Sequence, residues 1–309
     1  MLCCLFIHHI AFTQTPNNDT HWKLDWEDQF NNLNTNRWII MHNGKHGDEP
    51  QLYLENQVWT SNGNLVIELN NTKVNCPNPA PWPPSGACGK CESGKQYNYR
   101  SGWVETTDAY NPKFGYIEAR IKLPWRRENG KSWGFFPAFW TWIGGSVSNP
   151  TNAAEIDIFE MFCGEYKIPN TLNTCVHVCY KGDGTGPITY PTCVPSRLGV
   201  AHTPSGYDFT EWHTYAIEWN ANRIIWYLDG KAIRTLANHK IVDTVRIILN
   251  LAIQGQSKYH PPTTGTWAEY MYVDYVKVYS LVQILSNPQI FYYHHFQVPN
   301  PTRLFSFFM

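Results

Sequence analysis

The sequence predicts an all-β protein in which two antiparallel sheets are stacked as a sandwich. Apolar and polar residues alternate with a period of two in many segments from about residue 22 to residue 280, which is the pattern of half-buried strands. The period of an amphipathic helix is almost absent from the same region. Loop signals separate the alternating segments, and many short strands of this kind favour a sandwich.

Two segments illustrate the strand predictions. In 115–123, small and apolar side chains occupy one face and Tyr, Glu, Arg and Lys occupy the other, as in a strand with only one face in the core. Segment 223–228 runs into Asp229-Gly230, a pair that supplies the positive φ angles of a tight turn, so a hairpin through residue 233 is expected. The other predicted strands are 64–69, 133–141, 154–160, 174–180, 213–219, 245–253 and 271–279.

The long loops and the ends of the chain carry separate expectations. Residues 75–92 hold five prolines and 181–208 are rich in Gly, Pro and Thr, so both are predicted as long loops that shape a binding face. Residues 1–13 are interpreted as a signal peptide, truncated at its charged start, with a disordered N-terminus as the alternative. We therefore expect a secreted or periplasmic protein with one catalytic domain over 22–280. The tail 281–309 has no functional interpretation.

Composition limits the function classes. With 309 residues, of which 43% are hydrophobic, the chain is long enough for one large β domain. Its formal net charge of -1 does not favour binding to nucleic acid or to an anionic membrane, and no segment is long and apolar enough to span a bilayer. The 15% aromatic content favours a neutral ligand with apolar faces, and we expect a monomer.

The nine cysteines allow disulfides, zinc ligands or free thiols. Cys88-x-x-Cys91 and Cys175-x₃-Cys179 have the spacing of metal pairs. In an exported protein disulfides are the favoured interpretation. Seven cysteines remain after removal of the leader, so at least one thiol stays free.

The segment that carries chemistry is 154–161, where three acids interrupt an apolar strand: Glu155, Asp157 and Glu160. On a regular strand Glu155 and Asp157 share a face with Cα atoms about 6.6 Å apart, whereas Glu160 points to the opposite face. A one-residue β-bulge near Ile158-Phe159 would return Glu160 to the first face. The two glutamates could then bring their carboxyls to about 5 Å, the spacing of a retaining glycosidase. A calcium site and a solvated surface are the alternatives.

Several further blocks resemble glycoside hydrolase family 16, in the form with the bulged motif found in its laminarinase-like, agarase and carrageenase branches. The blocks occur in the family's order and span residues 22 to 280, and they are 114–124, 136–142, 155–160, 213–219, 226–231, 249–252 and 271–279. The resemblance implies a β-jelly-roll sandwich with a concave substrate cleft. It also implies endo-acting, retaining hydrolysis of β-glucans or galactans, without a cofactor for the chemistry.

The resemblance assigns residue roles by position. Glu155 corresponds to the nucleophile, Asp157 to its assistant and Glu160 to the acid/base. Trp140, Trp142, His177, Asn43, Glu49 and Gln254 correspond to substrate-binding positions. Core packing is the alternative for the two tryptophans, and an ordinary hydrogen-bonded structural role is the alternative for His177. A structural calcium, bound in many members, would be held by Glu27, Gly63 and Asp274, with a plain surface acid as the alternative for Asp274.

Two departures concern the substrate. Trp103 follows Ser-Gly where many laminarinase-like members have Arg, and Ala153-Ala154 give an unusual start to the acidic motif. The expected substrate is a laminarin-type β-1,3-glucan, with a red-algal galactan (agarose, porphyran or carrageenan) or a mixed-linkage glucan next. A transglycosylase and a carbohydrate-binding lectin on the same sandwich are the competing functions, and the acid trio argues against the lectin because binding alone does not need it.

Overall fold

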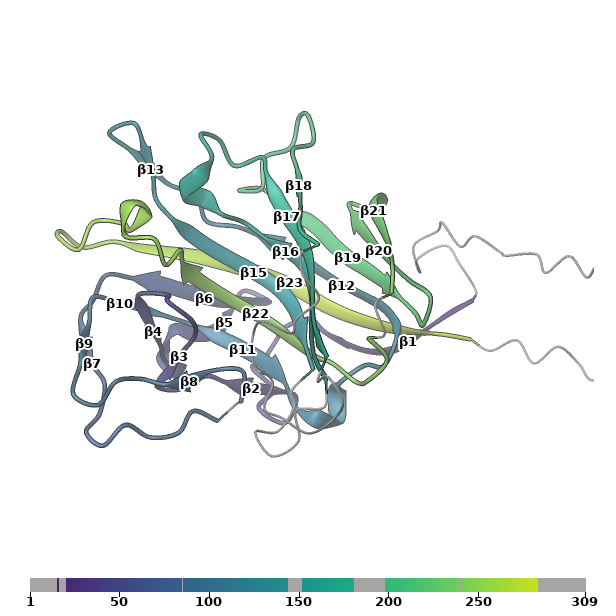
Figure 1. Ribbon diagram of the computed structural model, residues 1–309, viewed down its shortest axis with the longest axis horizontal. Helices are drawn as coiled ribbons and strands as arrows, with labels where there is room; N and C mark the ends of the chain where they lie inside the picture. The colour runs from purple at the N-terminus through teal and green to yellow at the C-terminus, as the bar shows by residue number, and fades with distance from the viewer. Residues whose placement is uncertain are drawn as a thin grey trace, which may run out of the picture.

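The computed structural model is built of two stacked β-sheets (Figure 1). It describes residue 16 and residues 21–84, 86–143, 152–180, 198–238 and 241–282, and of residues 152, 153 and 178–180 it describes the backbone only. Among the described residues, strands run from Trp22 to Leu281. The predicted all-β sandwich is therefore confirmed.

The larger sheet has the strand order β21-β20-β19-β12-β23-β6-β10-β4-β3-β8, with β1 also paired to β23 and β5 to β6. Its strand β23, yellow in Figure 1, lies between β12 and β6. The bounds of its strands are β1 (Trp22–Asp28), β3 (Gly44–Lys45), β4 (Gln51–Tyr53), β5 (Val58–Ser61), β6 (Asn64–Asn70), β8 (Gly89–Lys90), β10 (Tyr99–Ser101), β12 (Gly115–Lys122), β19 (His213–Trp219), β20 (Arg223–Leu228), β21 (Lys231–Ala237) and β23 (Ala268–Leu281).

The second sheet has the order β18-β17-β16-β15-β22-β11-β2. All of its pairings are antiparallel. Its strands are β2 (Trp38–Ile40), β11 (Trp103–Thr106), β15 (Phe135–Trp142), β16 (Asn152–Glu160), β17 (Leu172–Tyr180), β18 (Val200–His202) and β22 (Arg246–Ile253). Strands β15, β16 and β17 lie side by side in it, so the acidic motif on β16 is flanked by two well-paired neighbours.

Short elements complete the described chain. Two small ribbons pair β7 (Val74–Asn75) with β9 (Gln96–Tyr97) and β13 (Arg127–Glu128) with β14 (Lys131–Ser132). Single 3₁₀ turns are η2 (Glu55–Gln57), η3 (Asp108–Tyr110), η4 (Cys163–Glu165) and η6 (Ser257–Tyr259). None of the helices in the described ranges is long and apolar enough to cross a bilayer.

The main core lies between the two sheets and is filled by alternate residues of both. On β22, Ile247, Leu249, Leu251 and Ile253 belong to this core, whereas Ile248 and Ala252 belong to a second apolar cluster on the other face of the same sheet. Such two-sided burial explains why the strand reads as a nearly continuous apolar run. Removal of this apolar surface from water, at about 25 cal/mol per Å², supplies most of the driving force for folding.

The strand predictions match the structure closely, with one correction. Segments 213–219 and 223–228 form strands with those bounds, and the hairpin turn has positive φ at Asp229 (47°) and Gly230 (73°). The polar face of β12 is not solvated as predicted, because Tyr116 and Glu118 are buried. Aromatic rings from neighbouring strands cover them, and Glu118 accepts a hydrogen bond of 2.9 Å from the hydroxyl of Tyr275.

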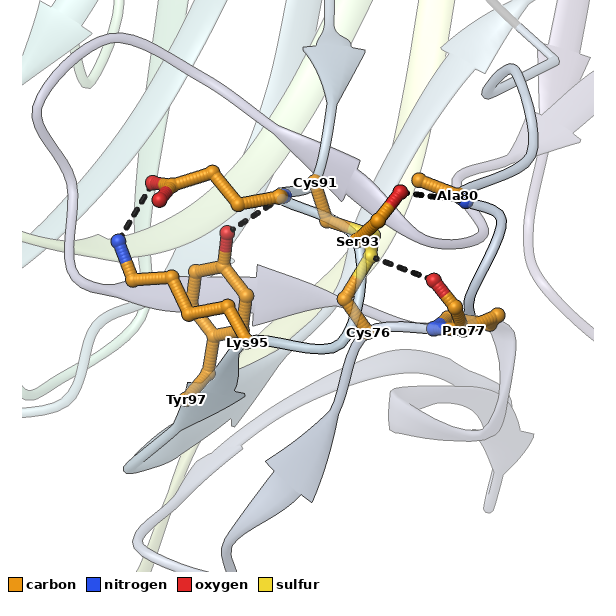
Figure 2. The surroundings of a disulfide bond; sticks show 8 residues. Cys76, Pro77, Ala80, Cys91, Ser93, Lys95 and Tyr97 are labelled. Atoms are coloured by element: carbon orange, nitrogen blue, oxygen red, sulfur yellow. Dashed lines mark hydrogen bonds and ion pairs between the residues drawn. A yellow bond between two sulfur atoms is a disulfide. The ribbon is translucent and has the colours of Figure 1, made fainter.

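The proline-rich insertion is fastened by a disulfide between Cys76 and Cys91 (Figure 2). Cys91 is thus bonded to Cys76, and Cys88 is a buried free thiol, so the 88/91 pair is not a metal pair. The backbone amide of Ala80 donates a hydrogen bond of 2.9 Å to Ser93 Oγ across the same insertion. Residues 1–13, most of the loop 181–208 and nearly all of the tail 281–309 lie outside the described residues.

Candidate active site

The acidic strand β16 contains the predicted bulge. In its pairing with β15, Phe159 is opposite Phe139 and Asp157 is opposite Trp140, so Ile158 has no partner of its own. The pairing with β17 shifts by one residue at the same place. The bulge therefore lies within the predicted dipeptide.

The bulge puts the three acids on one face of the sheet. Ala154, Ile156, Ile158, Phe159 and Met161 all belong to the core between the sheets. The residues left over, Glu155, Asp157 and Glu160, belong to the opposite face. Across the strand pair, Trp142 is opposite Glu155, Trp140 is opposite Asp157 and Ala138 is opposite Glu160, so aromatic and small side chains of the second apolar cluster adjoin the acids.

His177 connects two of the acids. It lies on β17 directly opposite Glu155, and its Nε2 is 3.6 Å from Glu155 Oε1 and 3.3 Å from Asp157 Oδ2. The second separation is an ion pair without hydrogen-bond alignment, because Asp157 Oδ2 has no hydrogen-bond partner among the described residues. His177 thus lies between the buried Asp157 and the partly buried Glu155, and its substrate-binding role stays a prediction.

Burial and mutual repulsion shift the titration of the trio. Burial, followed by the charge of Asp157, raises the pKa of Glu155 to about 8. Burial and the charge of Glu160 raise the pKa of Asp157 to about 6. Although burial alone would lower the pKa of His177, its contacts with Asp157, Cys175 and Glu155 raise it to about 11. The site therefore holds an imidazolium beside carboxyls that resist full ionisation, as expected when like charges are close.

The two tryptophans of β15 differ in accessibility. Trp140 is only 5% exposed, and its indole N–H donates a 2.8 Å hydrogen bond to Asn250 Oδ1. Trp142 is partly exposed and packs against the same cluster. The core-packing alternative therefore fits Trp140, which forms the floor of the acid face, and a stacking platform is open only at Trp142.

The remaining predicted substrate positions are held in polar networks. Glu49 is 5% exposed and accepts 2.7 Å hydrogen bonds from Gln51 Nε2 and the hydroxyl of Tyr53. The carbonyl oxygen of the Gln254 side chain accepts from the backbone amide of Gly164 at 2.8 Å. Asn43 is 5% exposed and has a positive φ of 55°. These side chains are placed by the fold, and Glu49 is tied to the acid face through His46.

His46 is a site residue that sequence reasoning missed. Its ring centroid is 5.5 Å from that of Trp103 and 5.9 Å from that of Trp140, and its Nδ1 is 3.3 Å from Glu49 Oε1. Burial opposes protonation, but the hydrogen bond to Glu49 and the charges of Glu49 and Glu155 raise its pKa. A single histidine does not by itself indicate a function. The only sign of His46 in the sequence is its place in the loop between two predicted substrate positions, Asn43 and Glu49.

Trp103 and Glu105 were not expected in the buried floor. Trp103 is 0% exposed and packs edge-on against Trp140 at 5.3 Å. Its indole N–H donates to Glu105 Oε2 at 3.2 Å, and Arg246 forms an ion pair with the same buried acid. The departure from the family pattern at position 103 is therefore accommodated in the floor of the site.

The calcium site expected at Glu27, Gly63 and Asp274 stays a prediction. The strand register brings the end of β1 and the start of β6 to β23 on either side of Asp274. However, Asp274 Oδ2 is 2.7 Å from Arg120 Nη1, and Glu27 Oε1 accepts a hydrogen bond from Gln29. Gly63 occupies a tight turn with a φ of 72°. Each carboxylate thus has a partner within the protein, with which an ion would compete.

A basic hollow of about 340 Å³ adjoins the position of Gln254. Its charged lining is Arg127, Lys131, Lys167, Lys258 and Glu165. Glu165 Oε1 accepts a 3.3 Å hydrogen bond from Gln254 Nε2, which links the hollow to a predicted substrate position. Four cations against one acid make this hollow suitable for an anionic group.

Comparisons with known proteins agree with the fold and the motif. The model of the family described as Glycosyl hydrolases family 16 matches residues 48–254. The catalytic domain of the laminarinase from Thermotoga maritima MSB8 superposes with a TM-score of 0.62 at 27% sequence identity, covering 84% of this chain and 99% of that one. The fold likeness thus extends over nearly the whole of a solved catalytic domain.

Curated relatives are similar over part of their length. The endo-1,3-1,4-beta-glycanase EglC of Rhizobium meliloti is 33% identical over 60% of this chain and 34% of its own length. The glucan endo-1,3-beta-glucosidase A1 of Niallia circulans is 27% identical over 83% of this chain and 37% of its own length. This chain therefore spans about a third of the length of these two relatives.

Proposed function

Because the chain belongs to glycosyl hydrolases family 16, we propose that it is a retaining endo-glycosidase that cleaves internal β-1,3-linkages of a laminarin-type glucan. The observation that carries the proposal is the bulge of β16, which puts Glu155, Asp157 and Glu160 on one face. The glucanase and laminarinase names of the relatives support the choice of substrate.

In the proposed reaction Glu155 and Glu160 act from opposite sides of the scissile bond. Glu160 donates a proton to the glycosidic oxygen while a carboxylate oxygen of Glu155 attacks the anomeric carbon. The leaving sugar departs with that proton, and a glycosyl-enzyme ester remains. Glu160, now ionised, removes a proton from a water that attacks the same carbon and releases Glu155. Two inversions give net retention.

Asp157 and His177 are proposed to set the charge of the nucleophile. The negative charge of Asp157 raises the pKa of Glu155, so the two carboxyls titrate as a pair. The imidazolium of His177, 3.6 Å from Glu155, favours the ionised carboxylate that attack requires. Removing either residue would therefore change the ionisation of Glu155 without removing the nucleophile itself.

The substrate is proposed to bind along the face of the sheet that carries the three acids and to extend outward from them. Trp142 supplies the ring on which a sugar face stacks, and Asn43, Glu49 and Gln254, each only 5% exposed, are proposed to make polar contacts through the small part of each that is exposed. Trp140 and His177 act from the floor. The partner is thus a polysaccharide, and the chemistry uses the chain's own acids without a cofactor.

A sulfated red-algal galactan is the second substrate class, and one observation favours it. The hollow lined by Arg127, Lys131, Lys167 and Lys258 lies next to Glu165, which is bonded to Gln254. A sulfate group on a sugar bound near Gln254 would find these cations. A transglycosylase would use the same glycosyl-enzyme ester with a sugar acceptor in place of water.

The Cys76–Cys91 disulfide supports the proposal that the protein works outside the reducing cytosol, in a secreted or periplasmic location. A signal peptide over 1–13, the domain bounds 22–280 and a monomeric state remain predictions.

The deciding experiment is a substrate screen with product analysis. Laminarin, lichenan, agarose, porphyran and carrageenans are incubated with the enzyme, and the anomer of the first products on the active polymer is followed by NMR. We expect release of laminarin oligosaccharides with the β anomer formed first. Initial formation of the α anomer would contradict the proposed pair of carboxylates, and activity on carrageenan or porphyran alone would replace the glucan assignment.

A further inference from the structure

Strand β17 carries two metal-binding side chain types on the face that bears the acids. Cys175 and His177 are two residues apart, so both project to the same side of the sheet. Cys175 is directly opposite Asp157 in the strand pairing, and His177 is opposite Glu155. A carboxylate oxygen of Asp157, the Sγ of Cys175 and a ring nitrogen of His177 all lie within 4.8 Å of one another.

Asp157 and Cys175 have binding capacity that their contacts within the protein leave largely unused. Asp157 is 1% exposed, and its Oδ2 lacks a hydrogen-bond partner in the described part of the chain, which is rare for a buried oxygen. Cys175 is buried and forms no disulfide, and its hydrogen bond to the backbone oxygen of Val176 is long at 3.8 Å. The printed polar contact of this oxygen is the 3.3 Å ion pair with His177 Nε2, a member of the same set, so a buried oxygen without a hydrogen bond, opposite a free thiol, indicates a place for a cation.

The donor types select the cation. One sulfur, one imidazole nitrogen and one carboxylate oxygen are the ligands of zinc and of softer divalent ions, whereas calcium and magnesium take oxygen ligands alone. Zinc bonds of about 2.0–2.3 Å put tetrahedral ligands closer together than the largest separation here, so the side chains must close by about an ångström. His177 is one-third exposed, which gives a hydrated ion access from the acid face.

Two positive charges oppose the ion, because the imidazolium of His177 must lose its proton before its nitrogen can bind a metal, and a guanidinium lies nearby. The guanidinium of Arg234 interacts electrostatically with Cys175 and Asp157 and is bonded to the hydroxyl of Thr174 at 2.9 Å. Burial raises the pKa of the Cys175 thiol, so an ion must displace the thiol proton to bind the sulfur. A thiophilic ion, which can displace the proton from the sulfur, therefore fits this set, whereas a weakly bound hard cation does not.

We propose that Asp157, Cys175 and His177 form a binding site for a thiophilic divalent cation, Zn²⁺ or Cd²⁺, and that its occupation inhibits the enzyme. The inhibitory half rests on the proposed function, because the ion occupies the carboxylate and imidazole that set the charge of Glu155. The binding half does not depend on it. Cys175 contacts the ion and takes no part in hydrolysis.

The binding half is tested with Cd²⁺ alone. Cd²⁺ is titrated into the full chain while the ultraviolet thiolate-to-cadmium absorption band is recorded. We expect a band that saturates and that Cys175→Ser abolishes, while Cys163→Ser, which removes another buried free thiol, retains it. Absence of the band from the wild type, or its full survival in Cys175→Ser, refutes the site. Circular dichroism and the melting temperature of each variant check that it is folded.

The inhibitory half is tested with Zn²⁺ during hydrolysis. Without metal, Cys175→Ser should keep kcat within about twofold of the wild type, and its half-inhibiting Zn²⁺ concentration should rise at least tenfold. Equal inhibition of both proteins refutes inhibition through this site. If no polysaccharide is cleaved at all, the proposed function fails, whereas the Cd²⁺ titration still decides the metal site.

Discussion

Ile158 and Phe159 are neighbours on one strand, yet both side chains point into the core between the sheets. A regular strand would send one of them to the opposite face, so this pair is the bulge itself. Because two successive residues face inward, the phase of the strand is reversed beyond them, and Glu160 emerges on the side of Glu155 and Asp157. The hydrophobic core thus fixes the alignment of the acids.

The first prediction concerns Glu155→Gln. The amide cannot form the glycosyl ester, so kcat should fall by at least about 10³-fold while oligosaccharide binding changes little. Reducing-sugar assays and isothermal titration with a laminarin oligosaccharide measure the two effects. Glu128→Gln is the matched control, because Glu128 is exposed on the β13 ribbon and the change should leave turnover unaltered. Activity of Glu155→Gln within tenfold of the wild type contradicts its role as nucleophile.

The second prediction concerns the pH dependence of kcat/KM. Attack needs ionised Glu155, so kcat/KM should rise with pH as the coupled acids ionise, between about 6 and 8. Asp157 raises the pKa of Glu155 and His177 lowers it. Asp157→Asn should therefore move the rising limb to lower pH, and His177→Gln should move it to higher pH, each by about one unit. Shifts in the same direction would show that these residues do not act through Glu155.

The acid trio could be predicted from the sequence because the spacing i, i+2, i+5 leaves one geometric solution. Acids at 155, 157 and 160 share a face only if one extra residue intervenes, and the apolar pair 158–159 is the place where an extra inward residue costs least. Strands such as 213–219 could be predicted for a similar reason, since burial of one or both faces imposes a period of two.

Other features depend on partners that are distant in the sequence. Glu118 looks solvated on its own strand, and only the pairing of β12 with β23 brings Tyr275 over it. The Cys76–Cys91 bond could not be chosen among the pairings of the cysteines without coordinates. His46 joins the site because its loop crosses the face of β15 and packs its ring near Trp140, which no local pattern indicates.

The third prediction is that Glu155→Gln stabilises the protein in a pH-dependent way. The folded state raises the pKa of Glu155 from 4.5 to about 8, so between these values the native protein binds more protons than the unfolded chain. Its stability must therefore fall as pH rises through this window. The Glu155→Gln variant has no carboxyl at this position, so its stability should not fall in this pH window.

Part of the gain is offset because His177 loses an anionic partner in the variant. We expect a net gain of about 1 kcal/mol at pH 8, or ~2–4 °C in Tm, and no difference below pH 4.5. Thermal melts from pH 4 to pH 8 measure it, with Glu128→Gln as a control that should follow the wild type. A variant less stable than the wild type at pH 8 would show that the charge of Glu155 is well compensated in the fold.

The fourth prediction separates the two tryptophans of β15. Trp140 is buried and hydrogen-bonded to Asn250, so Trp140→Ala should lower the free energy of unfolding by about 3–5 kcal/mol through the cavity it creates. Trp142 is partly exposed beside Glu155, so Trp142→Ala should raise KM about tenfold with a smaller loss of stability, since it removes a stacking surface for sugar.

Chemical denaturation and steady-state kinetics on both variants measure this contrast, and Trp142→Phe, which keeps a ring, should recover most of the lost affinity. The contrast follows from strand geometry, because both rings lie on the same face of β15 but Trp140 is nearer the centre of the sheet, beneath His46 and Trp103. Equal effects of the two alanine variants on KM, with stability unchanged in both, would contradict this contrast. Trp140 would then contact the substrate and stack on a sugar, as its position in the sequence implied.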